Sequence, residues 1–189
     1  THTGSLPRPR ALTRLHAKRS RGEQVDPALV AAEAEAAVRA IVPRQIAAGI
    51  DIPNNGEQGR ESFVLYLRDR LTGLGGESRR GGWQDVDAYP EFKAEWQAAG
   101  AAKEGASMTA NLPAAVGAVS YTGAAAMAAE CAEFAAALSP HAARCAGAFM
   151  AAPSHGIVAA DVMNRHYECE EGYLAALATA LRQEYAAIL

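Results

Sequence analysis

Two short segments of the chain, Gly4-Ser5 and Gly56-Glu57, place a polar side chain directly after a glycine. A glycine lets a ligand approach the backbone closely, and a neighbouring carboxylate can bind an ammonium group through charge-assisted hydrogen bonds. Residues of these types at such turns could therefore contact a ligand. The structural alternative makes Gly4-Ser5 a plain turn and Glu57 an acid at the start of a helix, stabilised by the helix dipole. Arg60 either orients Glu57 from one helical turn away or is an ordinary exposed arginine.

The other reactive side chains are isolated from one another. Cys131, Cys145 and Cys169 are an odd number at wide spacing, which fits neither a disulfide framework nor a closed zinc knuckle, so we expect reduced thiols. His166 and Cys169 have a spacing that two metal ligands could share on a helix, but such isolated pairs are usually incidental. His155 follows Pro-Ser in a predicted turn, where we expect a surface histidine. We assign no catalytic residue and no metal ligand.

Short strand-like runs alternate with longer helical runs along the chain, a pattern typical of βα units with a parallel sheet. The runs that predict strands are residues 1–6, 50–52, 114–121 and 146–152. Helices are predicted from Pro27 onward, around residues 63–67, within residues 83–96 and over residues 124–138. A last helix is predicted at the end of the chain, with these apolar residues on one face: Tyr173, Leu174, Leu177, Leu181 and Ile188. About four βα units result, half of the eight in a (β/α)₈ barrel, although a doubly wound open sheet has the same local pattern.

Prolines and glycines indicate where several of these elements begin and end. Asp26 is suited to cap a helix whose first residue is Pro27, because proline lacks only an N–H that is unpaired there. Pro43 should kink or break that helix, and Gly49 should end the segment. The five glycines of residues 73–82 predict a surface loop; no Lys-Ser/Thr pair follows them to make a phosphate site.

Composition favours one soluble globular domain over residues 1–189. The chain is 50% hydrophobic and 21% charged, enough for a real core, and its formal net charge is -3. Its basic clusters at residues 8–21 and 79–80 are short, so we expect no nucleic-acid partner. No stretch approaches the roughly 20 apolar residues of a membrane helix, so we expect no membrane partner. Residues 1–10 lack the apolar core of a secretion signal, which predicts a cytoplasmic location.

Three sets of segments carry a resemblance to a known family. They are His2-Thr3-Gly4-Ser5-Leu6-Pro7-Arg8-Pro9; then Gln45, residues 48–52, Asn55-Gly56-Glu57-Gln58-Gly59-Arg60, Tyr66 and residues 71–73; and finally residues 117–123 with Asn164, Tyr167, residues 171–174 and Glu184-Tyr185. In this order and at these distances they resemble the catalytic carboxy-terminal domain of cobalamin-independent methionine synthase and its short bacterial relatives. The resemblance implies the amino-terminal half of a TIM barrel.

The resemblance also implies a substrate pocket. In this family the Gly-Ser segment holds the amino-acid part of homocysteine, and the Gly-Glu carboxylate binds its amino group. Carried over residue by residue, this places Thr3, Gly4, Ser5 and Glu57 in the pocket. The implied function is part of a 5-methyltetrahydropteroyltriglutamate-homocysteine S-methyltransferase-like enzyme of methionine biosynthesis.

The family's chemistry uses a zinc ion, which lowers the thiol pKa of homocysteine so that the thiolate attacks the methyl donor. In the family the zinc ligands are a His-x-Cys pair, a glutamate and a distant second cysteine. This chain has no His-x-Cys pair, and its cysteines fall outside the family's metal motifs. Residues 108–112 lack the basic and cysteine residues that resemble the folate-contacting segment, which argues against a methyl-folate donor. Asn55 stands where the family tends to have aspartate or histidine.

Two alternatives remain open. The first is alkyl transfer to another thiol such as coenzyme M, whose sulfonate has no ammonium group for Glu57 to bind. The second is a non-catalytic half-barrel that acts by self-association, because half a barrel leaves strand edges and helix faces uncovered. For a half-barrel we expect a homo-oligomer or pairing with a missing carboxy-terminal half.

Overall fold

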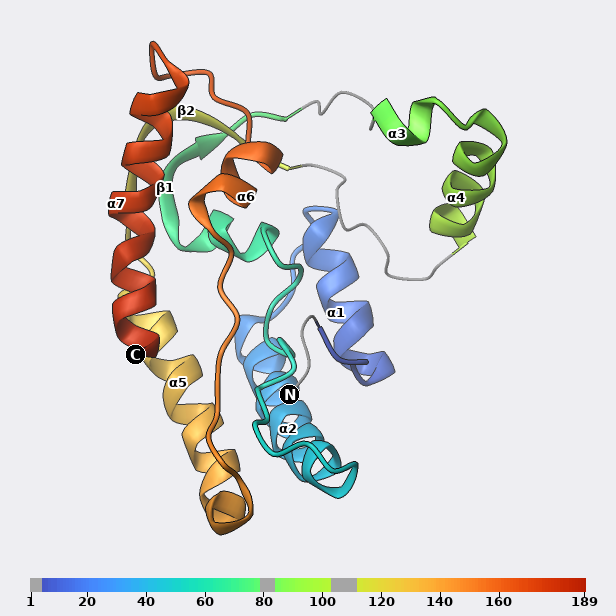
Figure 1. Ribbon diagram of the computed structural model, residues 1–189, viewed down its shortest axis with the longest axis vertical. Helices are drawn as coiled ribbons and strands as arrows, with labels where there is room; N and C mark the ends of the chain where they lie inside the picture. The colour runs from blue at the N-terminus through green and yellow to red at the C-terminus, as the bar shows by residue number, and fades with distance from the viewer. Residues whose placement is uncertain (1–4, 79–83, 103–111) are drawn as a thin grey trace.

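Helices dominate the structure, a computed structural model that describes residues 5–78, 84–102 and 112–189 (Figure 1). The described elements are, in chain order, α1 (Arg10–Ser20), α2 (Pro27–Ala47), the 3-10 helix η1 (Leu65–Asp69), β1 (Leu71–Gly75), α3 (Gln84–Asp87), α4 (Pro90–Ala102), β2 (Ala114–Tyr121), α5 (Ala124–Leu138), the 3-10 helix η2 (Ser139–Arg144), α6 (His155–Asp161) and α7 (Glu170–Ile188). Of the described helices, none is both long enough and apolar enough to cross a membrane.

Within the described residues, the sheet consists of β1 and β2, which pair antiparallel. Leu71 lies opposite Tyr121 and Gly75 opposite Ala114, with a bulge between Thr72 and Leu74. The expected α/β fold, half of a TIM barrel with about four βα units and a parallel sheet, is therefore wrong. The error has a physical reason: alternation identifies a strand, but its partner and direction depend on segments far away in sequence.

The segment β1 corrects a second expectation. Residues 73–75 belong to this strand, although they begin the glycine-rich segment 73–82 that we predicted to be a surface loop. Residues 79–82 lie outside the described part of the chain. Gly73 has φ +78°, and a Cβ there would lie 2.4 Å from the Ala118 carbonyl oxygen. A glycine at this position allows the two strands to approach at the bulge.

Two other predicted strands are irregular segments that nevertheless lie side by side. The Ala146 N–H donates to the Asp51 carbonyl at 2.8 Å, and the Phe149 N–H donates to the Pro53 carbonyl at 3.2 Å. Pro53 has no N–H to return, and the Ile50 N–H is bonded back to Gln45 at 3.0 Å. A regular ladder therefore does not form. Of the first predicted strand, residues 1–4 lie outside the described part of the chain.

The local signals predicted several helices correctly. The Asp26 side chain accepts the Ala28 N–H at 2.9 Å and caps α2, with Pro27 as the first helical residue. The predicted helices at residues 124–138 and at the end of the chain are present as α5 and α7. The expected break at Pro43 is absent, because α2 continues to Ala47. Residues 63–67 form part of a turn and the short helix η1 instead of a longer helix.

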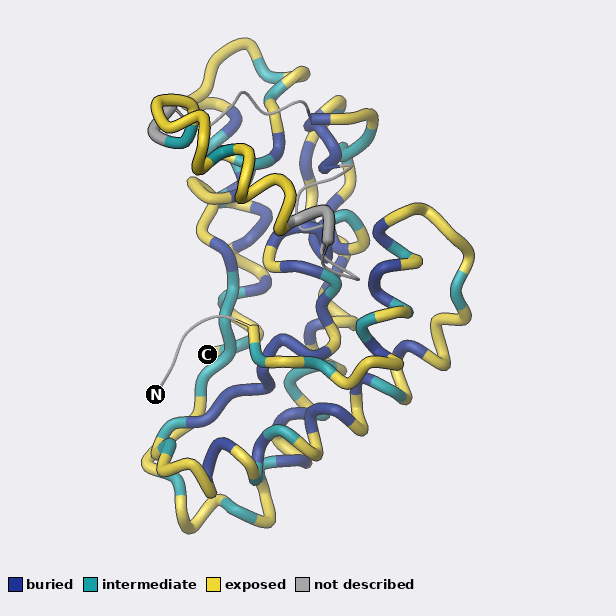
Figure 2. The backbone as a smooth tube through the Cα atoms, turned by 90° about the vertical axis from the view of Figure 1, so that its right-hand side faces the viewer, coloured by how far each residue is buried: buried dark blue, intermediate teal, exposed yellow. Residues whose placement is uncertain are grey.

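Three buried apolar clusters hold most of these elements together, and Figure 2 shows the buried stretches running through the interior. The smallest joins α1 to α2 through Leu12, Ala34 and Ala37. The largest cluster joins η1, β1, β2, α6 and α7 through residues that include Leu65, Tyr121, Val158 and Tyr173. The second packs α2 against α5 through Val38, Val42, Ile46, Phe134 and Ala137. Residues 53–58, in the segment that links α2 to η1, are all buried.

Candidate functional site

Glu57 lies in a buried turn at residues 56–59 and does not begin a helix. The structural alternative, an acid at a helix start, is therefore excluded. Its φ is +52°, and no other non-glycine residue of the described segments has a positive φ. Left-handed backbone costs a residue with a Cβ about 1 kcal/mol or more and is often found at functional sites.

The structure brings Ser5 to Glu57, although the two residues are 52 positions apart. The Ser5 hydroxyl donates to Oε2 of Glu57 at 2.5 Å. Beside this contact, the Leu6 N–H donates to the Gly56 carbonyl at 3.1 Å, and a Cβ on Gly56 would lie 3.2 Å from the Leu6 Cβ. Thr3 and Gly4, the other two residues predicted for the pocket, lie outside the described residues.

The second carboxylate oxygen of Glu57 has no hydrogen-bond partner among the described residues. Glu57 is only 2% exposed, so water does not reach this oxygen freely. Buried acceptors without donors are rare in folded proteins, because losing the bond to water costs about 1–3 kcal/mol. Among the described residues, Oε1 of Glu57 therefore keeps an unused capacity to accept a hydrogen bond.

Arg8 and His16 hold the turn from the other side. Nη2 of Arg8 donates to the carbonyls of Glu57 and Arg60, each at 2.8 Å. Nε2 of His16 donates to the Gln58 carbonyl at 2.9 Å. Burial lowers the pKa of His16, which the Gln58 carbonyl only partly offsets, so His16 is a neutral donor near pH 7. Both side chains thus hold backbone carbonyls of this segment. The Arg8 guanidinium also attracts the Glu57 carboxylate electrostatically, although the hydrogen bond to that carboxylate comes from Ser5.

Arg60 does not contact the Glu57 carboxylate and is not exposed, so both expectations for it are wrong. It is 2% exposed and donates to Glu130 at 2.8 Å and to the Ala151 carbonyl at 2.5 Å. Its guanidinium also lies 4.4 Å from the centre of the Tyr66 ring. Arg60 therefore ties the Glu57 turn to α5 and to residues near α6.

A charged network continues from Glu130 into the interior. Arg70 donates to the other Glu130 oxygen at 2.5 Å and to Glu184 on α7 at 3.4 Å. Glu184, fully buried, also accepts the hydroxyls of Tyr66 and Tyr121. Burial opposes ionisation of Glu130, but the Arg60 and Arg70 guanidiniums outweigh it and lower the pKa of Glu130.

Sequence reasoning did not identify Arg70, Glu130 or Glu184 as residues of the site. A usable signal existed for Glu130, which interrupts an alanine-rich helix on a face that meets another element. Its partners Arg60 and Arg70 could not be predicted, because they lie 70 and 60 positions away in the sequence, after the Glu57 turn and just before β1.

The remaining candidates stay apart. His155 is exposed at the start of α6, and His166 and Cys169 are exposed in the segment before α7. The free cysteines share no site, and within residues 5–78, 84–102 and 112–189 no three His, Cys, Asp or Glu residues are grouped to hold a metal ion.

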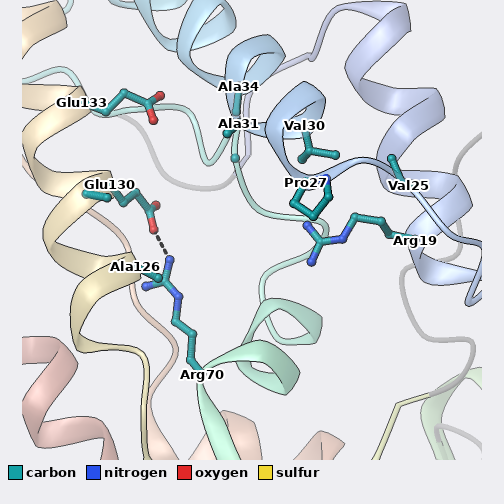
Figure 3. Close-up of a pocket in the computed structure, with 12 residues that line it drawn as sticks. Arg19, Val25, Pro27, Val30, Ala31, Ala34, Arg70, Ala126, Glu130 and Glu133 are labelled. Atoms are coloured by element: carbon teal, nitrogen blue, oxygen red, sulfur yellow. Dashed lines mark hydrogen bonds and ion pairs between the residues drawn. The ribbon is translucent and has the colours of Figure 1, made fainter.

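Two cavities border residues of the charged network and residues that hold the Glu57 turn. One of about 360 Å³ lies between α2 and α5, where Figure 3 shows the Glu130 to Arg70 ion pair with Glu133 above it and Arg19 on the opposite side. Another, of about 340 Å³, is lined partly by Arg8, Arg44 and Gln58. Neither cavity is lined by Ser5 or Glu57.

Comparison with known proteins gives a likeness in fold. No family model and no curated protein matches the chain. Among solved structures it is similar to a B12-independent methionine synthase from Shewanella sp. W3-18-1 in complex with selenomethionine, with a TM-score of 0.61 and 21% identity over 97% of this chain. The matched region is 47% of that structure, so the chain spans about half of its length. At this identity the likeness shows a related fold.

Proposed function

We propose that the chain supplies the amino-acid-binding part of a methyltransferase that acts on the thiol of homocysteine. The observation behind this proposal is the buried Glu57 carboxylate, with Oε2 held by Ser5 and Oε1 without a donor among the described residues. An α-ammonium group would donate to Oε1 and neutralise the buried charge. The related fold of a methionine synthase solved with selenomethionine, itself an amino acid, supports the same assignment.

The described residues do not fit a zinc site, since they hold no suitable group of ligands. We therefore assign to this chain only substrate binding: Glu57 holds the ammonium group, and Ser5 fixes the carboxylate that receives it. Activation of the thiol by zinc would require ligands that these residues do not supply. The methyl donor is not assigned.

Binding of homocysteine tests this proposal. In titration calorimetry, Glu57→Gln should weaken homocysteine binding about 10- to 100-fold, because a charge-assisted hydrogen bond contributes about 1.5–3 kcal/mol. The affinity for 4-mercaptobutyrate, which lacks the ammonium group, should change less than about threefold. A comparison with 2-mercaptoethanesulfonate tests the alternative of coenzyme M alkylation.

Glu61→Gln is the matched control, because Glu61 is a neighbouring carboxylate whose partner is Arg68, at 3.2 Å. This variant should bind homocysteine like the unaltered protein. Equal weakening by the two substitutions, or no binding by the unaltered protein, would refute the proposed role of Glu57. Tighter binding of the sulfonate than of homocysteine would favour the alkyl-transfer alternative.

A further inference from the structure

We propose that Asn55, held by Glu130, is a positioning residue that fixes the backbone of Glu57 and so determines the preference for an ammonium group. This inference rests on the proposed function for its meaning in substrate selection. The Asn55 Oδ1 accepts the Glu57 N–H at 3.0 Å, and its Nδ2 donates to Oε1 of Glu130 at 2.9 Å. One buried side chain thereby links the binding turn to helix α5.

The Glu130 carboxylate determines which way the Asn55 amide points. An ionised carboxylate only accepts hydrogen bonds, so Asn55 must turn its NH₂ toward Glu130 and its oxygen toward the Glu57 N–H. Glu130 is itself fixed, because Arg60 and Arg70 each donate to one of its oxygens. A 180° rotation of the amide would place two oxygens together and two donors together.

The Glu57 turn depends on such side chains, because it lies in neither a helix nor a strand. The Asn55 side chain accepts the Glu57 N–H, Arg8 donates to the Glu57 carbonyl, and Ser5 donates to Oε2 of Glu57. The left-handed φ of +52° would otherwise relax toward more populated backbone conformations. With these groups committed, Oε1 is the acceptor left for a ligand.

Asn54 fixes Gly56, the residue before Glu57, through a separate set of hydrogen bonds. Its Oδ1 accepts the Gly56 N–H at 2.7 Å, while its backbone exchanges two hydrogen bonds with the Gln45 side chain of α2. The turn is therefore anchored to α2 through Asn54 and to α5 through Asn55. Loss of Asn55 should loosen Glu57 without detaching the turn from α2.

The experiment combines a ligand-free and a ligand-dependent measurement on the full chain. In Asn55→Ala, NMR hydrogen exchange of the Glu57 amide should accelerate at least tenfold relative to the unaltered protein. The ratio of affinities for homocysteine and 4-mercaptobutyrate should fall at least tenfold, with mercaptobutyrate binding changed less than about threefold.

Two further variants separate positioning from general loss of stability. Tyr173→Phe removes one buried hydrogen bond, from its hydroxyl to the Val162 carbonyl at 2.8 Å, at a distance from the network, and should leave both measurements within about twofold. Asn55→Asp keeps an oxygen that can accept the Glu57 N–H but loses the hydrogen bond to Glu130. Its Glu57 amide should exchange more slowly than in Asn55→Ala, because the acceptor is retained, and faster than in the unaltered protein, because two carboxylates then face each other.

The outcomes distinguish this inference from the proposed function. Unchanged Glu57 exchange in Asn55→Ala, or equal acceleration in Tyr173→Phe, overturns the positioning role whatever the ligand does. If the unaltered protein binds no homocysteine, the proposed function and the role in ammonium selection both fail, and hydrogen exchange alone decides whether Asn55 fixes Glu57. If Glu57→Gln weakens homocysteine binding but Asn55→Ala leaves the affinity ratio unchanged, only the inference fails.

Discussion

At the scale of single residues, Glu57 combines three unfavourable features in one position. Its backbone is left-handed, its side chain is 2% exposed, and one carboxylate oxygen lacks a partner among the described residues. Each feature costs free energy of folding, so their coincidence points to a role other than stability. The glycine before Glu57 was visible in the sequence, but its meaning came from the turn that the structure shows.

Glu57→Asn should stabilise the protein by about 1 kcal/mol, because asparagine tolerates left-handed backbone and carries no buried charge. Glu57→Gln retains the side-chain length and the strained backbone conformation, so it should increase the free energy of unfolding by less. Urea denaturation of both variants measures the difference. If Glu57→Asn proves less stable than the unaltered protein, the turn is held in place by the carboxylate itself.

At the scale of elements, the bulge of β1 depends on Gly73. Gly73→Ala should lower the free energy of unfolding by about 3 kcal/mol, because the new Cβ would overlap backbone atoms of β2 in addition to its strained φ. Gly49→Ala is the control: φ there is +85° but nothing lies within 4 Å, so the cost should be about 1 kcal/mol. Equal costs for the two variants, measured by denaturation, would contradict the close approach of the strands.

The packing of α2 against α5 should make stability dependent on pH through Glu133. Burial, followed by the carboxylates of Glu130 on α5 and Glu35 on α2, raises the pKa of Glu133 to about 7, and Arg39 on α2 opposes the shift. Because the folded state then holds this proton more tightly than the unfolded state, stability should fall as pH rises from about 4.5 to about 7.

Glu133→Gln should remove this dependence. It should stabilise the protein at pH 8 by about 1 kcal/mol, a value reduced for the solvent screening of a half-exposed group, and by much less at pH 4. Thermal unfolding followed across this range measures the effect. Glu35→Gln should give a smaller gain, since Glu35 already pairs with Arg39 at 2.5 Å.

At the scale of the whole molecule, Glu184 joins parts of the chain that are distant in sequence. From α7 it accepts hydrogen bonds from Tyr66 in η1, from Arg70 before β1 and from Tyr121 at the end of β2. Through Arg70 and Glu130, the same network reaches α5 and the Glu57 turn. The expected homo-oligomer stays a prediction, which sedimentation velocity would measure.

Glu184→Ala should destabilise the protein by about 2–4 kcal/mol, because it leaves the buried hydroxyls of Tyr66 and Tyr121 without their acceptor and leaves Arg70 with Glu130 as its remaining carboxylate. Glu171→Ala removes an exposed carboxylate from the first turn of the same helix and should cost less than about 1 kcal/mol. Chemical denaturation compares the two. A cost for Glu184→Ala as small as that of Glu171→Ala would show that the network contributes little.

The sequence by itself determined the elements whose causes are local. Asp26 and Pro27 begin α2, and apolar residues at helical spacing form α7, because capping and periodicity act within a few residues. It also paired Ser5 with Glu57, but only through the resemblance of two motifs.

Tertiary structure alone decided the partner of β2, the irregular path of residues 50–52 and 146–152, and the burial of Arg60. These outcomes depend on contacts between segments that are distant in sequence. Many alternative pairs of segments offer similar hydrogen-bond donors, acceptors and charges. A local pattern cannot choose among them, because the choice is made by the free energy of the whole packed chain.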